Sequence, residues 1–379
     1  MKKKIVSMML ISAMAFGLIA CGKDTDVADV PSEVNQIQVD LGDTEEDTTD
    51  SLYDGEFWEQ TNESGQVRSY LTGDWTDPTY GRQRPVACMI ENTEACLPQY
   101  GISNAGVIYE CPVEGSITRM MAVFDDYADL EQIGNVRSSR PYYVYFASEY
   151  DAVYCHAGGN PAAFELIDDK DLVDNLNGLD GDLDTSMYYR SSSAKAPHNL
   201  YTSGEGILKG IETRGYDMSL PEDYEPHFSF SEENYSPDGE DCAVVELYYY
   251  YNHPYWIYNE SDGLYYRYEF GDKQIDAGTG EQLTAKNIII QNVAWWTYAG
   301  SEYLGFYLPD TQGTGKFISN GKMVDIVWAK SGDDGMTYYC LDNDNYDLIK
   351  LNVGNTWIQV CQEDYSPENN YYASESDFH

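Results

Sequence analysis

The sequence predicts an α+β protein in which an N-terminal mixed α/β domain is followed by a mostly all-β C-terminal domain. Two observations support this prediction. Between about residues 70 and 217, short apolar segments alternate with segments of helical periodicity, as strands and helices of one domain do. From residue 242 onward, the apolar segments are rich in β-branched and aromatic residues, and Gly, Asn and Asp clusters separate them.

The chain begins with the features of an exported lipoprotein. Three lysines at positions 2–4 precede an apolar run, residues 5–20, that is shorter than the roughly 20 residues of a membrane span. The run ends in LIAC, which resembles a bacterial lipobox. We therefore expect residues 1–20 to be a lipoprotein signal peptide and Cys21 to carry a lipid such as palmitate. A plain signal peptide or an anchor helix is the alternative.

Residues 21–66 are expected to form an acidic, disordered tether, because they combine many acidic residues with few apolar ones. The whole chain has 65 acidic and 22 basic residues, a formal net charge of −43. Such a charge disfavours nucleic acids and anionic lipid headgroups as partners. We expect the lipid on Cys21 to hold the protein at the extracellular face of the cytoplasmic membrane, with a cell-wall component or an envelope protein as its partner.

The N-terminal domain is assigned to residues 67–217. Its expected strands are residues 86–90, 107–111, 117–124 and 151–155. One helix should open at Ser139-Arg140-Pro141, with Ser139 as N-cap and proline in the first turn. A second should run from Asn160-Pro161 to about residue 168. A third should follow the capping-box pair Thr202 and Glu205 and end at Gly215.

An acidic connector, residues 218–241, leads to the C-terminal domain, residues 242–362, and to a polar tail, residues 363–379, that is expected to be frayed. The expected strands of this domain are residues 243–251, 264–270, 287–293, 323–328, 336–340 and 357–360. Because no segment has a convincing helical period, a small sandwich or a partly open barrel is expected.

Besides Cys21, seven cysteines occur, at positions 88, 96, 111, 155, 242, 340 and 361. Their spacing contains no CxxC, so neither a zinc site nor a thioredoxin-type site is indicated. Most lie in apolar stretches, where a cysteine packs as a small core residue. Cys340 and Cys361 lie in expected strands that are close in sequence, so they are a candidate disulfide pair. The spacing of the cysteines does not decide whether they are bonded.

Several stretches resemble a known family. RPVACMIEN, NVRSSRPYY, DAVYCHAGGNP and KAPHNLY, followed by GTGKFISNGKMVDIVWAK and LNVGNTWIQV, occur in the order found in the DUF3048 family of YerB-like lipoproteins. The resemblance covers roughly residues 70–361. It implies an N-terminal and a C-terminal domain of that family, a lipid anchor and a location in the envelope of Gram-positive bacteria, but no reaction. One departure is Ala194, which stands before Lys195 where a further basic residue is expected.

Scarce basic residues gather in the first domain. The chain has nine arginines, yet Arg119, Arg137 and Arg140 fall within 22 residues, the last two beside an expected helix start. Helix N-termini favour anions, and arginine forks match carboxylates and phosphates. We therefore expect an anionic ligand to bind in this domain. The candidate residues are Arg119, Arg137, Ser138, Arg140, His156, Gly158, Gly159, Lys195, His198 and Asn199.

Structural roles are the alternative for each of these residues. The arginines can form ion pairs with the abundant acids, the glycines can form a plain turn, and the histidines can bond to backbone. The sequence has no GxSxG, HExxH or P-loop motif, so a binding protein is expected rather than an enzyme. The alternatives are a cell-wall enzyme that uses His156 or His198 as acid or base, and a non-catalytic scaffold.

No cofactor is expected. Two acidic clusters could hold calcium, although neither fits an EF-hand loop; they are Asp180, Asp182 and Asp184, and Asp342, Asp344 and Asp347. The tyrosine runs 248–251 and 265–266 could stack on sugar rings, and packing within strands is the simpler explanation.

Overall fold

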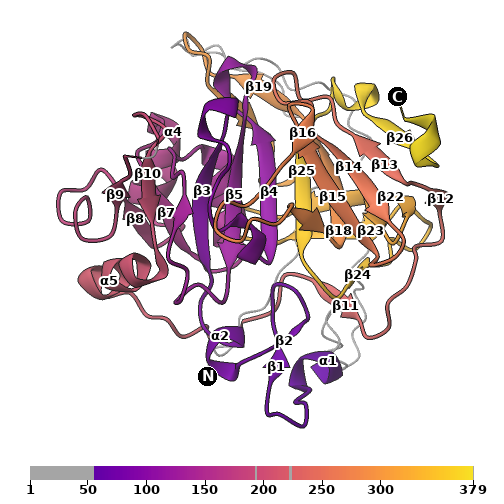
Figure 1. Cartoon of the computed structure of the whole chain (residues 1–379), viewed down its shortest axis with the longest axis horizontal. Helices are drawn as coiled ribbons and strands as arrows, with labels where there is room; N and C mark the ends of the chain where they lie inside the picture. Colours follow the sequence, from indigo (N-terminus) through magenta and orange to yellow (C-terminus); the bar gives the residue numbers. More distant parts are fainter. Residues whose placement is uncertain (1–54, 193, 222–223, 379) are drawn as a thin grey trace, which may run out of the picture. The chain divides into compact units, whose positions relative to one another are not determined.

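A large mixed sheet organises the part of the chain that the computed structural model describes, residues 55–192, 194–221 and 224–378 (Figure 1). Its eleven strands are β3 (Val86–Asn92), β4 (Val107–Pro112), β5 (Thr118–Phe124), β7 (Val153–His156), β8 (Asn175–Asn177), β12 (Glu240–Asp241), β18 (Asn287–Val293), β21 (Thr311–Ser319), β22 (Lys322–Lys330), β23 (Thr337–Leu341) and β25 (Thr356–Gln362). Their order is β12-β22-β21-β18-β25-β4-β5-β3-β7-β8, and β23 pairs with β22.

The two halves of the chain share this sheet. Strand β4 pairs in parallel with β25, from Val107 opposite Thr356 to Glu110 opposite Gln359. Both strands are buried along almost their whole length, so an unpaired edge would leave backbone groups without partners. The α+β class with a mostly β C-terminal region is confirmed. The expected small sandwich or partly open barrel is wrong, because the longest C-terminal strands extend the sheet of the N-terminal half.

A second sheet lies against the first. Its strands are β13 (Val244–Glu246), β14 (Tyr255–Asn259), β15 (Leu264–Glu269), β16 (Asp272–Lys273), β17 (Thr284–Ala285) and β26 (Asn370–Tyr372). Trp256 and Tyr265 share a hydrophobic core with Trp357 of β25. Strand β26 pairs with β13, and the ring of Phe378 lies 5.0 Å from that of Tyr255. Residues 363–378 are therefore part of the fold, and the expectation of a frayed tail is wrong.

Helices cover both faces of the large sheet. They are α3 (Pro141–Ser148), α4 (Pro161–Phe164), continued by a π-turn (Glu165–Asp169), and α5 (Gly204–Arg214). Side chains alternate across a strand, so Met89 of β3 packs into the core that contains α3, whereas Ile90 packs into the core that contains α5.

Local capping chemistry agrees only in part with expectation. Asn160 caps α4 by accepting from the N–H of Ala163 at 2.9 Å, and Gly215 ends α5 with a φ of 71°. Helix α5 begins after Ser203, whose Oγ accepts from the N–H of Gly206. The expected Thr202 instead donates to the carbonyl of Met187 at 3.0 Å.

The N-cap of α3 also differs from expectation. Arg140 occupies that position, without a capping hydrogen bond from its side chain, and Pro141 follows it. The expected Ser139 lies one residue earlier, where it continues the backbone pairing with the loop after β7.

Short elements complete the fold. They are α1 (Gly55–Glu59), α2 (Pro78–Gly81), β1 (Val67–Arg68), β2 (Trp75–Thr76), β6 (Ile133–Gly134), β9 (Tyr189–Arg190), β10 (Leu200–Thr202), β11 (Ser229–Ser231), β19 (Trp295–Thr297), β20 (Leu304–Phe306), β24 (Lys350–Asn352) and the single turns Glu94–Cys96, Ile102–Asn104, Glu114–Ser116, Ser366–Glu368 and Glu375–Asp377.

Two of these elements correct the expected boundaries. Phe57 of α1 is buried against Phe230, so ordered structure begins within the expected tether. Strand β11 of the expected connector pairs in parallel with β24. Apolar side chains thus draw both segments into the core.

Residues 1–54 lie outside the described part of the chain, so the expected signal peptide, the lipidated Cys21 and most of the tether do too. Of the helices that are described, none has the length and apolar character needed to span a bilayer. The seven cysteines that are described are all buried free thiols, so Cys340 and Cys361 are not paired in the structure.

Candidate functional site

Glu91 is the last but one residue of β3, and it places a carboxylate directly after a buried apolar run. The residue is only 2% exposed, and its partner across the sheet is Arg119 of β5. Directly opposite residues of antiparallel strands project to the same face. Two further basic groups reach the carboxylate: Nδ1 of His198 lies 2.5 Å from Oε1, and Nε of Arg137 lies 3.5 Å from Oε2. Two candidate residues, Arg137 and His198, thus meet at one buried carboxylate, and a third, Arg119, lies opposite it in the strand register.

The segment 135–139 positions Arg137 between two parts of the sheet. On one side, the N–H of Glu91 donates to the carbonyl of Asn135 at 2.9 Å. On the other side, the N–H of Ala157, in the loop after β7, donates to the carbonyl of Arg137 at 3.0 Å. The motifs NVRSSR and CHAGGN, separated in the sequence, therefore lie side by side in the fold.

A loop that leads into β10 positions His198. The carbonyl of His198 accepts from Nδ2 of Asn135, and its N–H donates to the carbonyl of Lys195 at 2.8 Å. Asn199 accepts at Oδ1 from the guanidinium of Arg190 at 3.0 Å. The Lys195 side chain is exposed. These contacts hold the imidazole against β3 and bring one more arginine to the cluster.

The cluster carries more positive than negative charge. Burial lowers the pKa of Arg137, the Glu91 carboxylate opposes that shift, and repulsion from Arg119 and Arg190 adds to it. Two further guanidinium groups are thus close enough to interact with that of Arg137, which alone of the three pairs with the Glu91 carboxylate. In a chain whose formal charge is −43, this local surplus is a distinct electrostatic feature.

Two atoms of the cluster have unused hydrogen-bonding capacity. Nε of Arg137 and Oε2 of Glu91 are both buried, and neither has a hydrogen-bond partner among the described residues. Their separation of 3.5 Å allows charge attraction but is long for a hydrogen bond. The side chains of Arg137 and His198 are 25% and 27% exposed. Other atoms of these two side chains can therefore be reached from solvent.

Arg140, a further candidate, is committed elsewhere. Its guanidinium forms a two-pronged ion pair with Glu114, with Nε 2.8 Å from Oε2. Nη1 donates to the carbonyl of Ser139 at 2.6 Å, and the ring of Tyr303 lies 5.2 Å away. This arginine therefore ties the start of α3 to the turn before β5.

His156 and the glycine pair form an internal turn. His156 is fully buried, with Nδ1 2.9 Å from the carbonyl of Gly158 and Nε2 3.3 Å from Oδ1 of Asn175, and burial lowers its pKa. Gly158 has a φ of 74°, and its N–H donates to Asn177. The neighbouring Gly159 pairs with Ser139. These residues shape the loop beside Arg137 and do not face a ligand directly.

Ser138 and Arg119 are also engaged with the backbone. Oγ of Ser138 donates to the carbonyl of Ala157 at 2.9 Å. Nη1 of Arg119 donates to the carbonyl of Ser138 at 2.6 Å. Both side chains fasten the segment that carries Arg137 to its neighbours.

Sequence reasoning missed three residues of this cluster, Glu91, Asn135 and Arg190. Glu91 had a usable signal, since an acid that ends a buried apolar strand needs a partner. Asn135 and Arg190 had none, because their contacts join segments far apart in the chain.

The calcium candidates do not come together as a metal site in the described residues, where no group of three or more His, Cys, Asp or Glu side chains could hold an ion. Asp180 and Asp182 instead pair with Arg214, at 2.7 and 3.1 Å.

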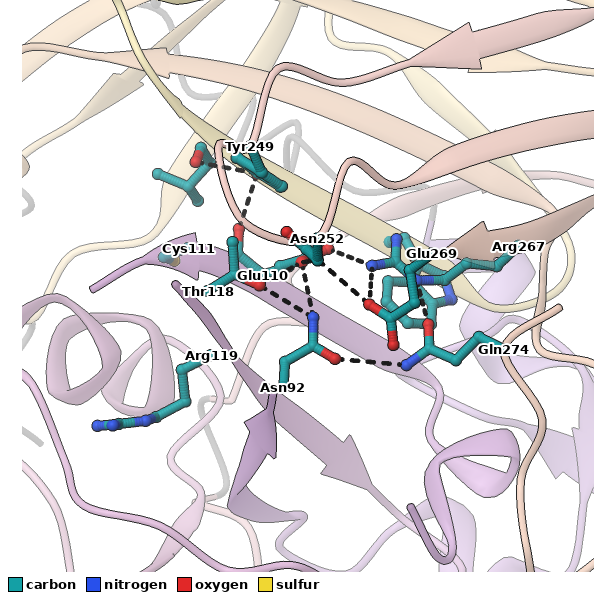
Figure 2. Close-up of polar contacts among 12 residues, drawn as sticks. Asn92, Glu110, Cys111, Thr118, Arg119, Tyr249, Asn252, Arg267, Glu269 and Gln274 are labelled. Carbon is teal, nitrogen blue, oxygen red and sulfur yellow. Dashed lines mark hydrogen bonds and ion pairs between the residues drawn. The ribbon is translucent and has the colours of Figure 1, made fainter. Parts of the chain in front are cut away.

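The next residue of β3, Asn92, belongs to a second polar cluster on the opposite face (Figure 2). Asn92 donates to Glu110 at 3.0 Å, and Glu110 forms an ion pair of 2.7 Å with Arg267. Glu269 lies 3.6 Å from the same arginine. Figure 2 shows the guanidinium of Arg119 turned away from this cluster. The four cluster residues named here are at most 2% exposed, so the cluster joins the two halves of the chain and is not open to a ligand.

Comparisons with known proteins agree with this architecture. Residues 71–217 match the family model "Protein of unknown function (DUF3048) N-terminal domain", and residues 245–358 match the model of the corresponding C-terminal domain. The chain is 29% identical over 301 residues to "Putative lipoprotein YerB" of Bacillus subtilis (strain 168), which covers 79% of this chain and 87% of the relative. The crystal structure of the YerB protein from Bacillus subtilis superimposes with a TM-score of 0.71 at 26% identity, over 81% of this chain and 100% of that chain.

Proposed function

Since this chain belongs to the DUF3048 family, whose function is unknown, we propose from its geometry that it is a lipid-anchored envelope protein that binds an anionic ligand. The ligand would be a cell-wall component that carries carboxylate or phosphate groups, or an acidic segment of a partner protein. The binding surface is the cluster around Arg137 and His198.

One observation carries this proposal. Arg137 and His198 both reach the buried carboxylate of Glu91, and their side chains are 25% and 27% exposed. Arg119 and Arg190 lie close enough to Arg137 to repel it. A guanidinium group binds carboxylate and phosphate oxygens through charge-assisted hydrogen bonds. An anion at this surface would bind the exposed part of the Arg137 guanidinium and neutralise the surplus charge.

The proposed anchor rests on the N-terminal sequence and on the relative. The basic residues at positions 2–4, the apolar run and Cys21 form a lipoprotein signal, and the relative in Bacillus subtilis is named a putative lipoprotein. Two or more acyl chains on one cysteine give stable membrane attachment. A chain that carries this much negative charge would not dock on anionic headgroups without such a lipid.

A retention experiment with purified cell-wall fragments tests the binding site. The chain from residue 22 onward keeps every described residue and needs no membrane. We expect it to retain the fragments, and Arg137→Ala to lower retention at least tenfold. Arg214→Ala is the matched control, because Arg214 is similarly exposed, at 28%, and pairs with two surface aspartates. Equal retention by both variants, or no retention by the unmodified chain, would reject the proposal.

A second candidate function, acid–base catalysis on the cell wall, is favoured by one contact. The buried carboxylate of Glu91 holds Nδ1 of the part-exposed His198 at 2.5 Å, an arrangement that orients an imidazole for proton transfer. Fragment masses measured before and after incubation test it. New masses that disappear with His198→Gln would establish an enzyme, whereas unchanged masses would leave binding alone. Retention of envelope proteins, with neither retention of cell-wall fragments nor new fragment masses, would indicate a scaffold.

A further inference from the structure

A polar cavity in the C-terminal half lies far from the arginine cluster in sequence. It has a volume of about 340 Å³ and lies between the turn that joins β14 to β15 and the turn that joins β21 to β22. Residues 234–236 close its third side. Its size falls within the range of roughly 300–1,000 Å³ that small-molecule sites occupy.

Contacts between the three segments hold the walls in place. Nδ2 of Asn320, in the second turn, donates to Oδ1 of Asn234 at 2.8 Å and to the carbonyl of Tyr235 at 2.5 Å. The ring of Tyr258 lies on Gly321, where an added Cβ would come within 2.8 Å of the ring. Gly321 has a φ of 75°, which other residues adopt at a cost. The cavity is therefore preformed.

A buried lysine lies beneath this cavity. Lys286 is 8% exposed, and its Nζ donates to Oδ1 of Asn320 at 2.5 Å and to the carbonyl of Gly263 at 3.3 Å. Within the described residues no carboxylate lies within ion-pair distance of it. Burial lowers the pKa of Lys286, and the charge of Asp262 opposes this shift. One ammonium group thus holds two lining residues, Asn320 and Gly263, from behind, while Glu260 and Asp262 lie on the wall of the cavity.

This lining excludes three ligand classes. An apolar ligand would desolvate amide, hydroxyl and carboxylate groups without giving them partners. An anion would be repelled by Glu260 and Asp262. A metal ion would lack ligands, because no group of three or more His, Cys, Asp or Glu side chains in the described part of the chain could hold one, and Asp262 already accepts from Asn259 at 3.0 Å and from Tyr266 at 2.7 Å.

We propose that this cavity is a second binding site, for a neutral saccharide. Hydroxyl groups both donate and accept hydrogen bonds, so they match a wall that offers carboxylate, amide and phenol groups together. Glu260 has no hydrogen-bond partner among the described residues and is free to accept from a sugar hydroxyl. The site is independent of the arginine cluster, and either can fail without the other.

Titration calorimetry with neutral tetrasaccharides tests this site. The probes are cellotetraose, maltotetraose and chitotetraose, and the protein is the chain from residue 22 onward. At least one probe should bind, and Glu260→Ala should weaken its binding about tenfold or more. Asp272→Ala is the control, because it removes an equally exposed acid that does not line the cavity. Arg137→Ala should leave saccharide binding unchanged.

Three results with the neutral probes would overturn the proposal. They are the absence of binding by every probe at millimolar concentration, equal binding by the unmodified chain and Glu260→Ala, and equal weakening by Glu260→Ala and Asp272→Ala. A cavity that takes up calcium ions or a uronate in place of the neutral probes would also reject it, since the charge argument would then be wrong.

Discussion

Arg267 and Glu110 form a fully buried ion pair, with Nη2 of the arginine 2.7 Å from Oε2 of the glutamate, although 157 positions separate them in the sequence. The guanidinium also lies 5.0 Å from the ring of Trp256 and 4.6 Å from that of Trp357. Glu110 belongs to the N-terminal family segment and the other three to the C-terminal one. This contact therefore adds a charge–charge link to the backbone pairing that joins the halves.

Removal of this arginine should destabilise the whole fold. Arg267→Leu leaves the carboxylate of Glu110 buried without its cation, which costs about 3–5 kcal/mol. The free energy of unfolding in urea, compared with that of the unmodified chain, measures the loss. Lys316→Ala is the control, because it breaks an ion pair whose partner Asp325 is largely exposed, and such pairs contribute at most about 1 kcal/mol. Similar losses in the two variants would contradict the prediction.

Stability should also depend on the protonation of Glu269. Burial raises the pKa of Glu269 to about 7; Arg267 opposes this shift and Glu110 adds to it. Because the folded pKa lies above the ordinary value of 4.5, the folded state keeps a proton that the unfolded state releases. Its contribution to stability is complete at low pH, and roughly 3 kcal/mol is lost as the pH rises from about 4.5 to about 7.

Glu269→Gln tests this pH dependence, since the amide resembles the protonated acid and does not titrate. The free energy of unfolding, measured at pH 5, 6 and 7, should shift in favour of the variant as the pH rises. Glu281→Gln, at an exposed position, should follow the unmodified chain. Parallel curves for Glu269→Gln and the unmodified chain would show that Glu269 does not titrate in this interval.

The buried thiols should be unreactive until the protein unfolds. Burial raises the pKa of Cys242 to about 12 and those of Cys340 and Cys361 to about 11, and only the thiolate attacks a disulfide reagent. The chain from residue 22 onward should release no colour from Ellman's reagent at pH 8 in buffer. In urea without a reductant, all seven thiols should react. A lower number in urea would reveal a disulfide that the structure does not contain.

One glycine should be irreplaceable because of a close backbone approach. A Cβ added to Gly204, at the start of α5, would lie 2.0 Å from the carbonyl oxygen of Tyr127. Gly204→Ala should therefore cost at least about 2 kcal/mol of unfolding free energy, since overpacking strains a core. Gly181→Ala is the control, because an added Cβ there meets no atom within 4 Å and should change stability by less than about 0.5 kcal/mol. Equal melting temperatures would contradict this prediction.

Predictions from local signals were correct where one residue decides the outcome. Asn160 caps α4 and Gly215 ends α5 as expected, because a cap needs only the side chain and the nearest backbone groups. The expected capping role of Thr202 was wrong, since its hydroxyl donates to the distant carbonyl of Met187 and Ser203 caps the helix instead. Local signals thus predict where a helix begins or ends to within one residue, and contacts with distant residues decide which residue is the cap.

In the candidate site, too, the sequence predicts some features and contacts with distant residues decide the others. The sequence identified Arg119, Arg137 and His198 from the scarcity of basic residues, and the structure brings them together on one face of the large sheet. It could not separate them from Arg140 and His156, which are held by Glu114 and by an internal turn. Their roles depend on which acid or carbonyl the fold brings near, and no spacing in the chain encodes that choice.

By itself, the sequence determined the α+β class, the resemblance to a two-part family, eight of the eleven strands of the large sheet and the helices α3, α4 and α5, because periodicity and turn chemistry act over a few residues. Only the tertiary structure decided that the halves share one sheet through β4 and β25 and that Glu91 collects the basic residues. The physical reason is that buried edges and buried charges must find partners. Those partners can lie far away in the sequence, as Thr356 does from Val107 and His198 from Glu91, so local patterns do not reveal them.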